Sequence, residues 1–211
     1  MSKIQEVAAA IENGKVKIIE ELVQQALDAG DEPNAILDEG MIAAMGIIGE
    51  KFQANEVFVP EMLIAAKTMR KGVEVLRPHL SSGSLGKQGK YIIGTVAGDL
   101  HDIGKNLVAL MIESAGFEVI DLGVDVPAEK FVEALREHPD CKIIGASALL
   151  TTTMEAMKNT VTAIHDGGYK GKVKVMVGGA PITQEFADQI GADAYTPDAG
   201  SAAAKAVELV S

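Results

Sequence analysis

The residues best suited to chemistry lie in the segment GDLHDIGKNL (98–107), which directly follows a β-rich run. Asp99, His101, Asp102 and Gly104 stand close together in it. A neutral imidazole is a common metal ligand, and a carboxylate two residues away can reach its second ring nitrogen, which fixes the tautomer and raises the basicity of the ligand. Gly104 allows the backbone to approach a neighbouring group closely at the start of a helix. The alternative for His101 is a loop histidine that caps a helix.

Two further β-rich runs are followed by small or hydroxyl-bearing residues. After one of them come Ser147 and the threonines 151–153, one of which is expected to cap the next helix with its side chain. After the other come Gly178 and Gly179, which form either a tight turn before a proline or a wall against which a flat or extended part of a ligand packs. The remaining histidines lack such neighbours and are interpreted as surface or helix-end residues: His79, His138 and His165.

Several common sites are absent from the sequence. It contains neither GxGxxG nor GxxxxGK[ST], so no dinucleotide or nucleotide phosphate cradle is indicated. It also lacks the GxSxG nucleophile elbow. A zinc site would need more His or Cys than these loops offer. One histidine suited to a metal, surrounded by small residues, favours a metal that arrives inside a large cofactor.

The elements that must position these residues differ between the two halves of the chain. Residues 1–80 carry apolar side chains at the i, i+3, i+4, i+7 spacing of amphipathic helices. Pro33 and Pro60 fit early positions of later helices. This half is therefore predicted to be a bundle of about four helices. The Gly- and Ser-rich segment SSGSLGKQGK (81–90) is predicted to be a linker, suited as a tether that lets the helical part move.

The second half alternates short β-rich runs with helical stretches. The runs are 91–96, 117–123, 142–149, 173–179 and 193–197, and the helical stretches lie near 104–115, 127–137, 153–166, 182–190 and 199–209. This alternation predicts a doubly wound, flavodoxin- or Rossmann-like parallel sheet of five strands with helices on both faces. Such sheets bind ligands beyond the carboxyl ends of their strands. The fold class is therefore α/β, with a helical bundle over 1–88 and a sheet domain over 89–211.

Composition narrows the class of protein further. The chain has 211 residues, of which 47% are apolar, so it can bury a core. Its 30 acidic and 19 basic residues give a net charge of -11, which disfavours binding to nucleic acid or anionic membranes. The single cysteine, Cys141, excludes a disulfide framework and is interpreted as a reduced, buried residue. Without a secretory signal or a long apolar stretch, a cytoplasmic location is expected.

The three strand-end segments resemble one known signature when they are taken together. Asp99-Leu100-His101-Asp102-Ile103-Gly104, Ser147-Ala148-Leu149 and Gly178-Gly179 are similar to the DxHxxG…SxL…GG pattern of cobalamin-binding domains of the methionine synthase type. The helical half is similar to the cap that precedes such a domain. Over essentially its full length, the chain resembles the stand-alone corrinoid proteins of bacterial and archaeal methyltransferase systems. Those systems serve methanol, methylamines, betaines or aromatic methyl ethers.

The resemblance implies a cobalamin or other corrinoid cofactor bound base-off and His-on. His101 would replace the cofactor's own dimethylbenzimidazole as the lower ligand of cobalt. Asp99 would hydrogen-bond the other nitrogen of His101, and Thr153 would complete a proton relay at a position where the family has serine. The threonine keeps the hydroxyl and adds a methyl group.

Contacts to the rest of the cofactor follow from the same resemblance. Residues near the lower face of the corrin would be Asp102, Ile103 and Gly104. Those lining the channel for the displaced nucleotide tail would be Ser147, Leu149, Thr151, Gly178 and Gly179. Apolar residues of the cap over the upper, methyl-bearing face would be Phe52, Val59 and Met62. The alternative for these last three is the core of the helical bundle, and the sequence leaves that choice open.

The function implied is that of a methyl carrier in one-carbon metabolism. Cobalt(I) would accept a methyl group from a substrate:corrinoid methyltransferase, and methyl-cobalt(III) would pass it to a second methyltransferase that acts on tetrahydrofolate or coenzyme M. The chain would be a carrier subunit without a complete active site of its own. Its expected partners are these two methyltransferases and a reductive activator. The methyl donor, the acceptor, the lower base of the corrinoid and the oligomeric state stay undetermined.

Three other functions compete with the carrier. A cobalamin-based sensor would share both domains, but a gene regulator needs a DNA-binding element for which this acidic chain has no spare length. The cobalamin subunit of a carbon-skeleton mutase would lack the helical cap. A cofactor-free flavodoxin-like module, such as a receiver domain, would need a phospho-accepting Asp with an acidic pair and a Lys. The visible spectrum of the purified protein separates the last of these from the others.

Overall fold

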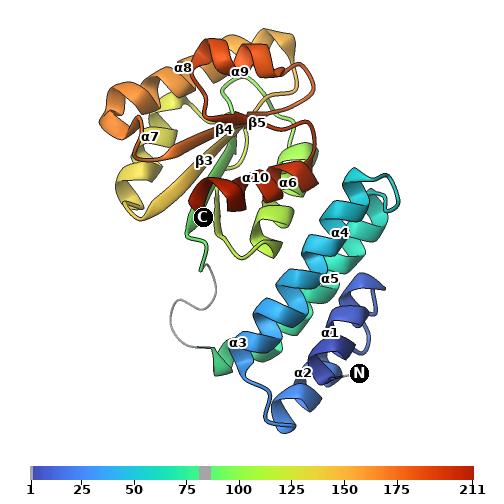
Figure 1. Cartoon of the computed structure of the whole chain (residues 1–211). Coiled ribbons are helices and arrows are strands. Elements are labelled where there is room, and N and C mark those ends of the chain that lie inside the picture. Colours follow the sequence, from blue (N-terminus) through green and yellow to red (C-terminus); the bar gives the residue numbers. More distant parts are fainter. Residues whose placement is uncertain (1, 81–86) are drawn as a thin grey trace. The chain divides into compact units, whose positions relative to one another are not determined.

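The computed structural model describes residues 2–80 and 87–211, and the chain divides into two compact units (Figure 1). The boundary between the units falls at Lys87 and Gln88. Of the linker predicted over 81–90, residues 81–86 lie outside the described residues. Lys90 belongs to strand β1, where it pairs with Glu118 of β2, so the predicted linker is too long at its C-terminal end.

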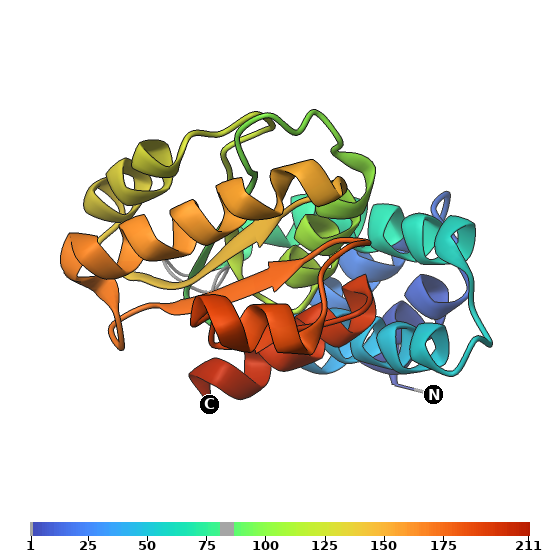
Figure 2. The same cartoon turned by 90° about the horizontal axis from the view of Figure 1, so that it is seen from above.

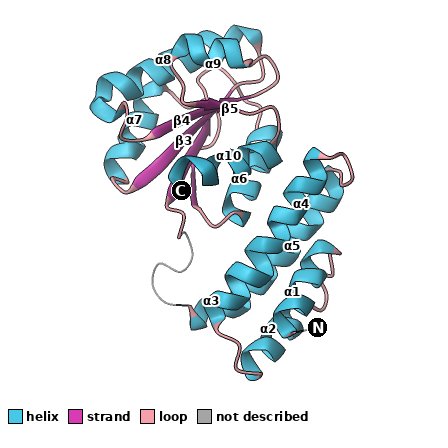
Figure 3. Ribbon diagram, in the orientation of Figure 1, coloured by secondary structure: helices cyan, strands magenta, loops and turns pink. Residues whose placement is uncertain are grey.

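The first unit is helical, as the apolar spacing predicted (Figure 3). Its elements are α1 (Lys3–Glu12), α2 (Ile19–Asp28), α3 (Pro33–Ala35), η1 (Ile36–Ile42), α4 (Ala43–Gln53), α5 (Val59–Leu76) and η2 (Arg77–His79). Pro33 and Pro60 lie in the first turns of α3 and α5, where a missing backbone N–H costs nothing. Because α3, η1 and α4 follow one another without a break, the described part of this unit contains four helical segments, as expected.

The core of the helical unit draws on all four segments. Its fully buried side chains include Val7 and Ile11 of α1, Ile19 and Val23 of α2, Met41 of η1, Ile48 of α4, and Met62 and Leu76 of α5. Burying a side chain of this size contributes about 1.5–3 kcal/mol. The helical spacing seen in the sequence thus marks the faces that pack together.

The second unit is an α/β sandwich around one sheet. Its strands are β1 (Lys90–Thr95), β2 (Glu118–Asp121), β3 (Cys141–Ser147), β4 (Lys174–Gly178) and β5 (Ala194–Tyr195). Its helices are α6 (Ile103–Ser114), α7 (Ala128–Glu137), η3 (Thr151–Thr153), α8 (Met154–Ile164), η4 (His165–Tyr169), α9 (Gln184–Ile190) and α10 (Ala199–Val210). Helices α7, α8 and α9 cover one face of the sheet, and α6 and α10 cover the other (Figures 1 and 3). The predicted fold class is confirmed.

The strand order decides which loops meet. All pairs are parallel, and the order across the sheet is β2-β1-β3-β4-β5; Figure 2 shows β3 and β4 as arrows that point the same way. The order reverses at β1, because β2 lies on one side of it and β3 on the other. A ligand crevice is expected outside the carboxyl ends of the strands at such a switch point. The loops after β1, β2 and β3 therefore meet at one edge.

Candidate functional site

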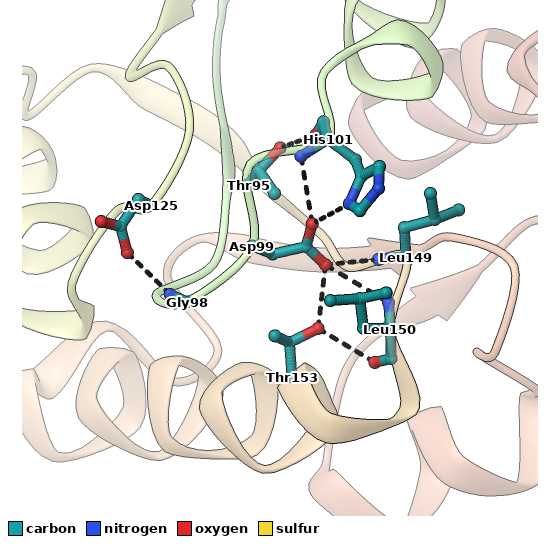
Figure 4. Close-up of polar contacts among 8 residues, drawn as sticks. All are labelled: Thr95, Gly98, Asp99, His101, Asp125, Leu149, Leu150 and Thr153. Carbon is teal, nitrogen blue, oxygen red and sulfur yellow. Dashed lines mark hydrogen bonds and ion pairs between the residues drawn. The ribbon is translucent and has the colours of Figure 1, made fainter.

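The carboxylate of Asp99 is the centre of the polar contacts at this edge (Figure 4). Its side chain is completely buried. Oδ1 lies 2.7 Å from His101 Nδ1 and accepts the His101 backbone N–H at 3.1 Å. Oδ2 accepts hydrogen bonds from the backbone N–H of Leu149 at 2.7 Å, from that of Leu150 at 3.3 Å and from Thr153 Oγ1 at 2.9 Å. An ionised carboxylate has about four acceptor sites, so both oxygens of Asp99 are fully used.

The described contacts hold the imidazole ring of His101 from the side of Nδ1. Its side chain is 50% exposed, and Asp99 bonds to Nδ1. A carboxylate at Nδ1 favours the tautomer whose proton sits on that nitrogen, which leaves Nε2 with a lone pair. The ring can therefore present Nε2 outward as a metal ligand or a hydrogen-bond acceptor. The predicted contact between Asp99 and His101 is confirmed by this geometry.

The charge on Asp99 is maintained by its neighbours. Burial acts to raise the pKa of this carboxyl, but hydrogen bonds from Leu149, His101 and Thr153 outweigh it and hold the pKa well below its ordinary value. The carboxylate is therefore ionised at neutral pH and strengthens its bond to the imidazole.

Replacing Asp99 by asparagine is expected to destabilise the fold in a pH-dependent way. At pH 7 we expect a loss of about 1–3 kcal/mol, because the amide has a single oxygen and cannot accept hydrogen bonds at both positions where the carboxylate accepts them. The folded pKa lies below the unfolded value of about 4, so the stabilisation is present above pH 4 and is lost as the pH falls through the folded pKa. Denaturant unfolding at pH 7, 5 and 3 should show a difference that narrows at pH 3.

The matched control for this substitution is Asp140→Asn, which removes a carboxylate whose side chain is 61% exposed and paired with Lys90. Exposed ion pairs contribute little, so its curve should follow the wild type closely. A difference between Asp99→Asn and wild type that stays constant from pH 7 to pH 3 would contradict the assignment of a low folded pKa to Asp99.

The sequence suggested two uses for the Thr153 hydroxyl, and the part of the chain that the structure describes contains the hydrogen bond to Asp99 but not the helix cap. It occupies the N-cap position of α8, yet within the described residues its side chain makes no cap bond. Its Oγ1 instead faces Asp99 Oδ2 and the Leu150 carbonyl oxygen, each at 2.9 Å. The expectation that one of the threonines caps the helix with its side chain is wrong, because Thr153 is the N-cap residue of α8 and its side chain is turned toward Asp99 and Leu150 rather than toward the first turn of the helix. Thr151 is exposed and lies in η3.

Gly178 and Gly179 differ in whether the fold has room for a side chain at their position. Gly179 has φ 126°, and a Cβ built there would lie 1.8 Å from the carbonyl oxygen of Ala148. Its carbonyl accepts the N–H of Ile182 at 3.0 Å, which closes the predicted tight turn. A Cβ on Gly178 would meet only the Thr196 carbonyl, at an ordinary 3.7 Å. The fold therefore requires glycine at 179 but leaves space at 178.

Exposed apolar side chains surround His101. Gly104 has open space where a Cβ would stand, and Asp102 accepts a hydrogen bond from Asn106 Nδ2 at 3.0 Å. Ser147, at the end of β3, is partly buried. The exposed apolar residues are Leu100 (72%), Ile103 (83%), Leu149 (44%) and Leu150 (39%). Apolar side chains grouped around a half-exposed histidine indicate a site for a ligand that is largely apolar.

Comparison with protein families decides between the possible ligands. Residues 89–208 match a family described as "B12 binding domain", and residues 3–77 match a second family with the same description.

The chain belongs to the B12-binding proteins.

The relatives of this B12-binding protein match it along almost its whole length. It is 43% identical over 207 residues to dimethylamine corrinoid protein 3 of Methanosarcina acetivorans, covering 98% of this chain and 96% of that one. It is 44% identical over 209 residues to the dimethylamine corrinoid protein of Methanosarcina barkeri, covering 98% and 97%. The trimethylamine corrinoid protein of Methanosarcina barkeri is 42% identical over 191 residues, covering 90% and 88%.

Solved structures share the same architecture. The chain superimposes on a methanol:cobalamin methyltransferase complex from Methanosarcina barkeri with a TM-score of 0.87 at 29% identity, covering 99% of this chain and 79% of that one. A cobalamin-binding protein from Desulfitobacterium hafniense gives a TM-score of 0.82 at 31% identity, covering 99% and 98%. Within residues 2–80 and 87–211, no helix combines the length and apolar character that crossing a bilayer requires.

The site of this B12-binding protein fits a corrinoid in its chemistry. The macrocycle is broad, flat and largely apolar at its faces, and it brings cobalt, which takes imidazole nitrogen as a ligand. The protein offers His101 with an outward Nε2, exposed apolar side chains beside it, open space at Gly104, and a Gly178 at which a Cβ would meet only the Thr196 carbonyl. No group of three or more His, Cys, Asp or Glu among the described residues could hold a bare metal ion. A metal carried within its own macrocycle is the kind that this site can accept.

In the helical unit, the three predicted cap residues differ in exposure. Val59 is 39% exposed, Phe52 is partly buried and Met62 is completely buried. Met62 therefore packs in the core of that unit, and its contact with the cofactor stays a prediction. The sequence interpretation missed Phe58, which precedes α5 and is 62% exposed, and Leu63, which is 45% exposed. Their place beside Val59 in the sequence was the signal that could have found them.

Proposed function

We propose that this B12-binding protein is the methyl carrier of a methyltransferase system that consumes a methylated amine. One observation carries the proposal: His101, held through Nδ1 by a buried carboxylate, lies in a chain that matches methylamine corrinoid proteins from end to end. A histidine held in this way is suited to ligate cobalt reversibly. A carrier needs such a ligand, whereas an acyl or phosphoryl transferase does not.

The residues around His101 have separate roles in this proposal. His101 Nε2 binds cobalt from the lower face, with the cofactor base-off and His-on. Asp99 keeps the proton on Nδ1 and orients the ring, and Thr153 donates to Asp99 from the far side. A bound corrinoid supplies a cobalt centre that can take up a methyl group and release it to an acceptor. The ionised carboxylate of Asp99 would keep the imidazole ring oriented both with and without a metal at Nε2.

The remaining contacts follow the order of the loops. Asp102, Ile103 and Gly104 lie beneath the corrin in this proposal. The nucleotide tail would run past Gly178, where an added Cβ would meet only the Thr196 carbonyl, with Gly179 shaping the turn beside it. Ser147, Leu149 and Thr151 line the same channel.

The helical unit, residues 1–88, acts as the cap, and residues 89–211 form the cobalamin-binding domain. Phe52 and Val59 offer partly exposed apolar surface to the methyl-bearing face, together with Phe58. Met62 would reach the cofactor only if its side chain left the core. Apolar contact excludes water from the reacting bond.

The partners are proposed from the chemistry of a carrier. A first methyltransferase must activate the methylated amine, and a second must deliver the methyl group to tetrahydrofolate or coenzyme M. A reductive activator must restore cobalt that has been oxidised. The relatives named for dimethylamine and trimethylamine make an amine the favoured donor, and a dimethylamine-specific methyltransferase is the first partner to test.

The experiment loads the purified protein with hydroxocobalamin and reduces it with a chemical reductant. Dimethylamine, trimethylamine, monomethylamine and methanol are then each supplied with a methyltransferase specific for that donor. Methylation is expected to be at least about tenfold faster with one amine system than with methanol, and the visible spectrum reports it. Equal, slow methylation by all four systems would contradict the carrier function. Methylation by the methanol system alone would contradict the amine.

A further inference from the structure

Two residues outside the family signature hold the loop that carries His101. Thr95, the last residue of β1, is completely buried, and its Oγ1 donates a hydrogen bond to the His101 carbonyl oxygen at 2.9 Å (Figure 4). This bond closes the loop from 95 to 101 into a ring. The carbonyl oxygen belongs to the same residue whose imidazole faces outward, so Thr95 restrains the backbone from which the ring projects.

Thr95 is itself a rigid anchor, because the sheet holds its backbone. Its N–H donates to the Gly123 carbonyl at 2.9 Å, and its own carbonyl accepts the N–H of Val126 at 2.9 Å. On the other side it stands in register with Ser147 of β3. Because this backbone is fixed in the sheet, the buried hydroxyl of Thr95 is a donor at a fixed position, and the loop is held where its carbonyl oxygen accepts that bond. The His101 backbone is therefore tied to the interior of the fold.

Asp125 restrains the same loop at its middle. It lies in the loop after β2 with φ 53°, a conformation that non-glycine residues rarely adopt. Its Oδ1 accepts the N–H of Gly98 at 2.7 Å, and its own N–H donates to the Asp99 carbonyl at 2.9 Å. Side chain and backbone together clip two consecutive residues of the loop. The left-handed backbone at Asp125 allows both bonds to form at once.

We propose that Thr95 and Asp125 are positioning residues for the cobalt ligand. Their hydrogen bonds restrain the backbone of the loop that carries His101, and this restraint limits the positions that His101 Nε2 can occupy. The inference rests on the proposed function, in which His101 ligates cobalt. With the backbone held at both points, the imidazole would approach or withdraw from a bound cobalt by rotating about its side-chain bonds. Loosening the loop lets the backbone drift and lowers the population of ring positions from which Nε2 reaches the metal.

The principal test compares Thr95→Val with Thr95→Ser. Valine keeps the shape of threonine and removes the donor, whereas serine keeps the donor. Each variant is loaded with hydroxocobalamin and reduced to the cobalt(II) state, and electron paramagnetic resonance measures the fraction with a nitrogen ligand. The ratio of nitrogen-ligated cobalt(II) to cobalt(II) without a nitrogen ligand should fall about three- to tenfold in Thr95→Val. In Thr95→Ser this ratio should stay within about twofold of the wild-type value.

A second readout uses the protein without cofactor. Amide hydrogen exchange of residues 97–101 should accelerate at least about fivefold in Thr95→Val and remain near the wild-type rate in Thr95→Ser. If Thr95→Val matches the wild type in both measurements, the inference is overturned while the proposed function stands. If His101→Ala retains the nitrogen signal, the proposed function falls and the inference falls with it.

Asp125→Ala keeps the inference testable if Thr95→Val does not fold, because Asp125 is exposed and its removal opens no core cavity. Its matched control is Asp140→Ala, which removes an exposed carboxylate of equal charge before β3. Asp125→Ala should shift both readouts in the same direction as Thr95→Val, and Asp140→Ala should shift neither. Equal behaviour of the two alanine variants would overturn the positioning role of Asp125.

Discussion

Replacing His101 by alanine should remove the nitrogen ligand of cobalt and slow methyl transfer by more than about 100-fold. Losing an outer partner of a metal ligand already costs about 10–100-fold, and this substitution removes the ligand itself. Within the described residues of the sheet domain, the loops after β1, β2 and β3 contain no other histidine, because His138 is the C-cap of α7 and His165 begins η4. The nitrogen signal of the cobalt(II) form and the rate of methyl transfer measure the two effects separately.

The matched control for this substitution is His138→Ala at the C-cap of α7. It removes an imidazole of the same kind from outside the site and should change neither readout. Added free imidazole should restore part of the nitrogen signal to His101→Ala, since the ring position is half exposed. Methyl transfer by His101→Ala at the wild-type rate would show that cobalt does not need this ligand during turnover.

Replacing Gly179 by alanine should destabilise the protein by about 3 kcal/mol or more. The new methyl group would lie 1.8 Å from the carbonyl oxygen of Ala148. The backbone φ of 126° at this position is also one that residues other than glycine rarely adopt. Ala148 and Gly179 directly follow the paired strands β3 and β4, so the backbone of neither residue can move away without breaking contacts between these strands. Chemical denaturation of the cofactor-free protein measures the loss, and the variant is expected to yield little folded protein.

Gly178→Ala is the matched partner of this variant and should behave in the opposite way. Its methyl group would meet only the Thr196 carbonyl at 3.7 Å, so the free energy of unfolding should change by less than about 1 kcal/mol. Its affinity for hydroxocobalamin should fall at least about tenfold, because the methyl group occupies the space proposed for the nucleotide tail. Wild-type affinity in Gly178→Ala would refute that placement, and a stable Gly179→Ala would refute the steric argument.

The sequence alone was sufficient for the parts of this protein that depend on local pattern. Alternating β-rich and helical runs predicted the parallel sheet, and helical spacing predicted the bundle, because a burial pattern repeats with the period of the element that carries it. The spacing of Asp99 and His101 predicted their contact, since residues two apart in a loop can close a small ring. These are short-range consequences of residue type and order.

Contacts between distant segments needed the tertiary structure. The backbone N–H groups of Leu149 and Leu150 donate to Asp99, yet a backbone amide leaves no mark in a sequence. Thr95 looks like any threonine in a strand, and Asp125 like any acid in a loop, until the sheet order places their loops beside His101. Which strands are neighbours is set by crossovers and by packing across the whole domain. The partners of a residue from another segment therefore appear only in the fold.

The two glycines and Thr153 mark the boundary between what each source of information decides. The residue types predicted a turn or a wall at 178–179, and the structure shows that the turn requires glycine at 179, where a side chain would collide with the Ala148 carbonyl oxygen, but sets no such requirement at 178. The residue types predicted a helix cap by one of the threonines 151–153, and the family resemblance predicted that Thr153 acts with Asp99; the structure contains the bond from Thr153 to Asp99 and, among the residues it describes, no side-chain cap at Thr153. Sequence order predicted which elements form, because that depends on local propensity and burial period. The tertiary structure decided which chemical groups meet, because distances between segments are a property of the packed chain.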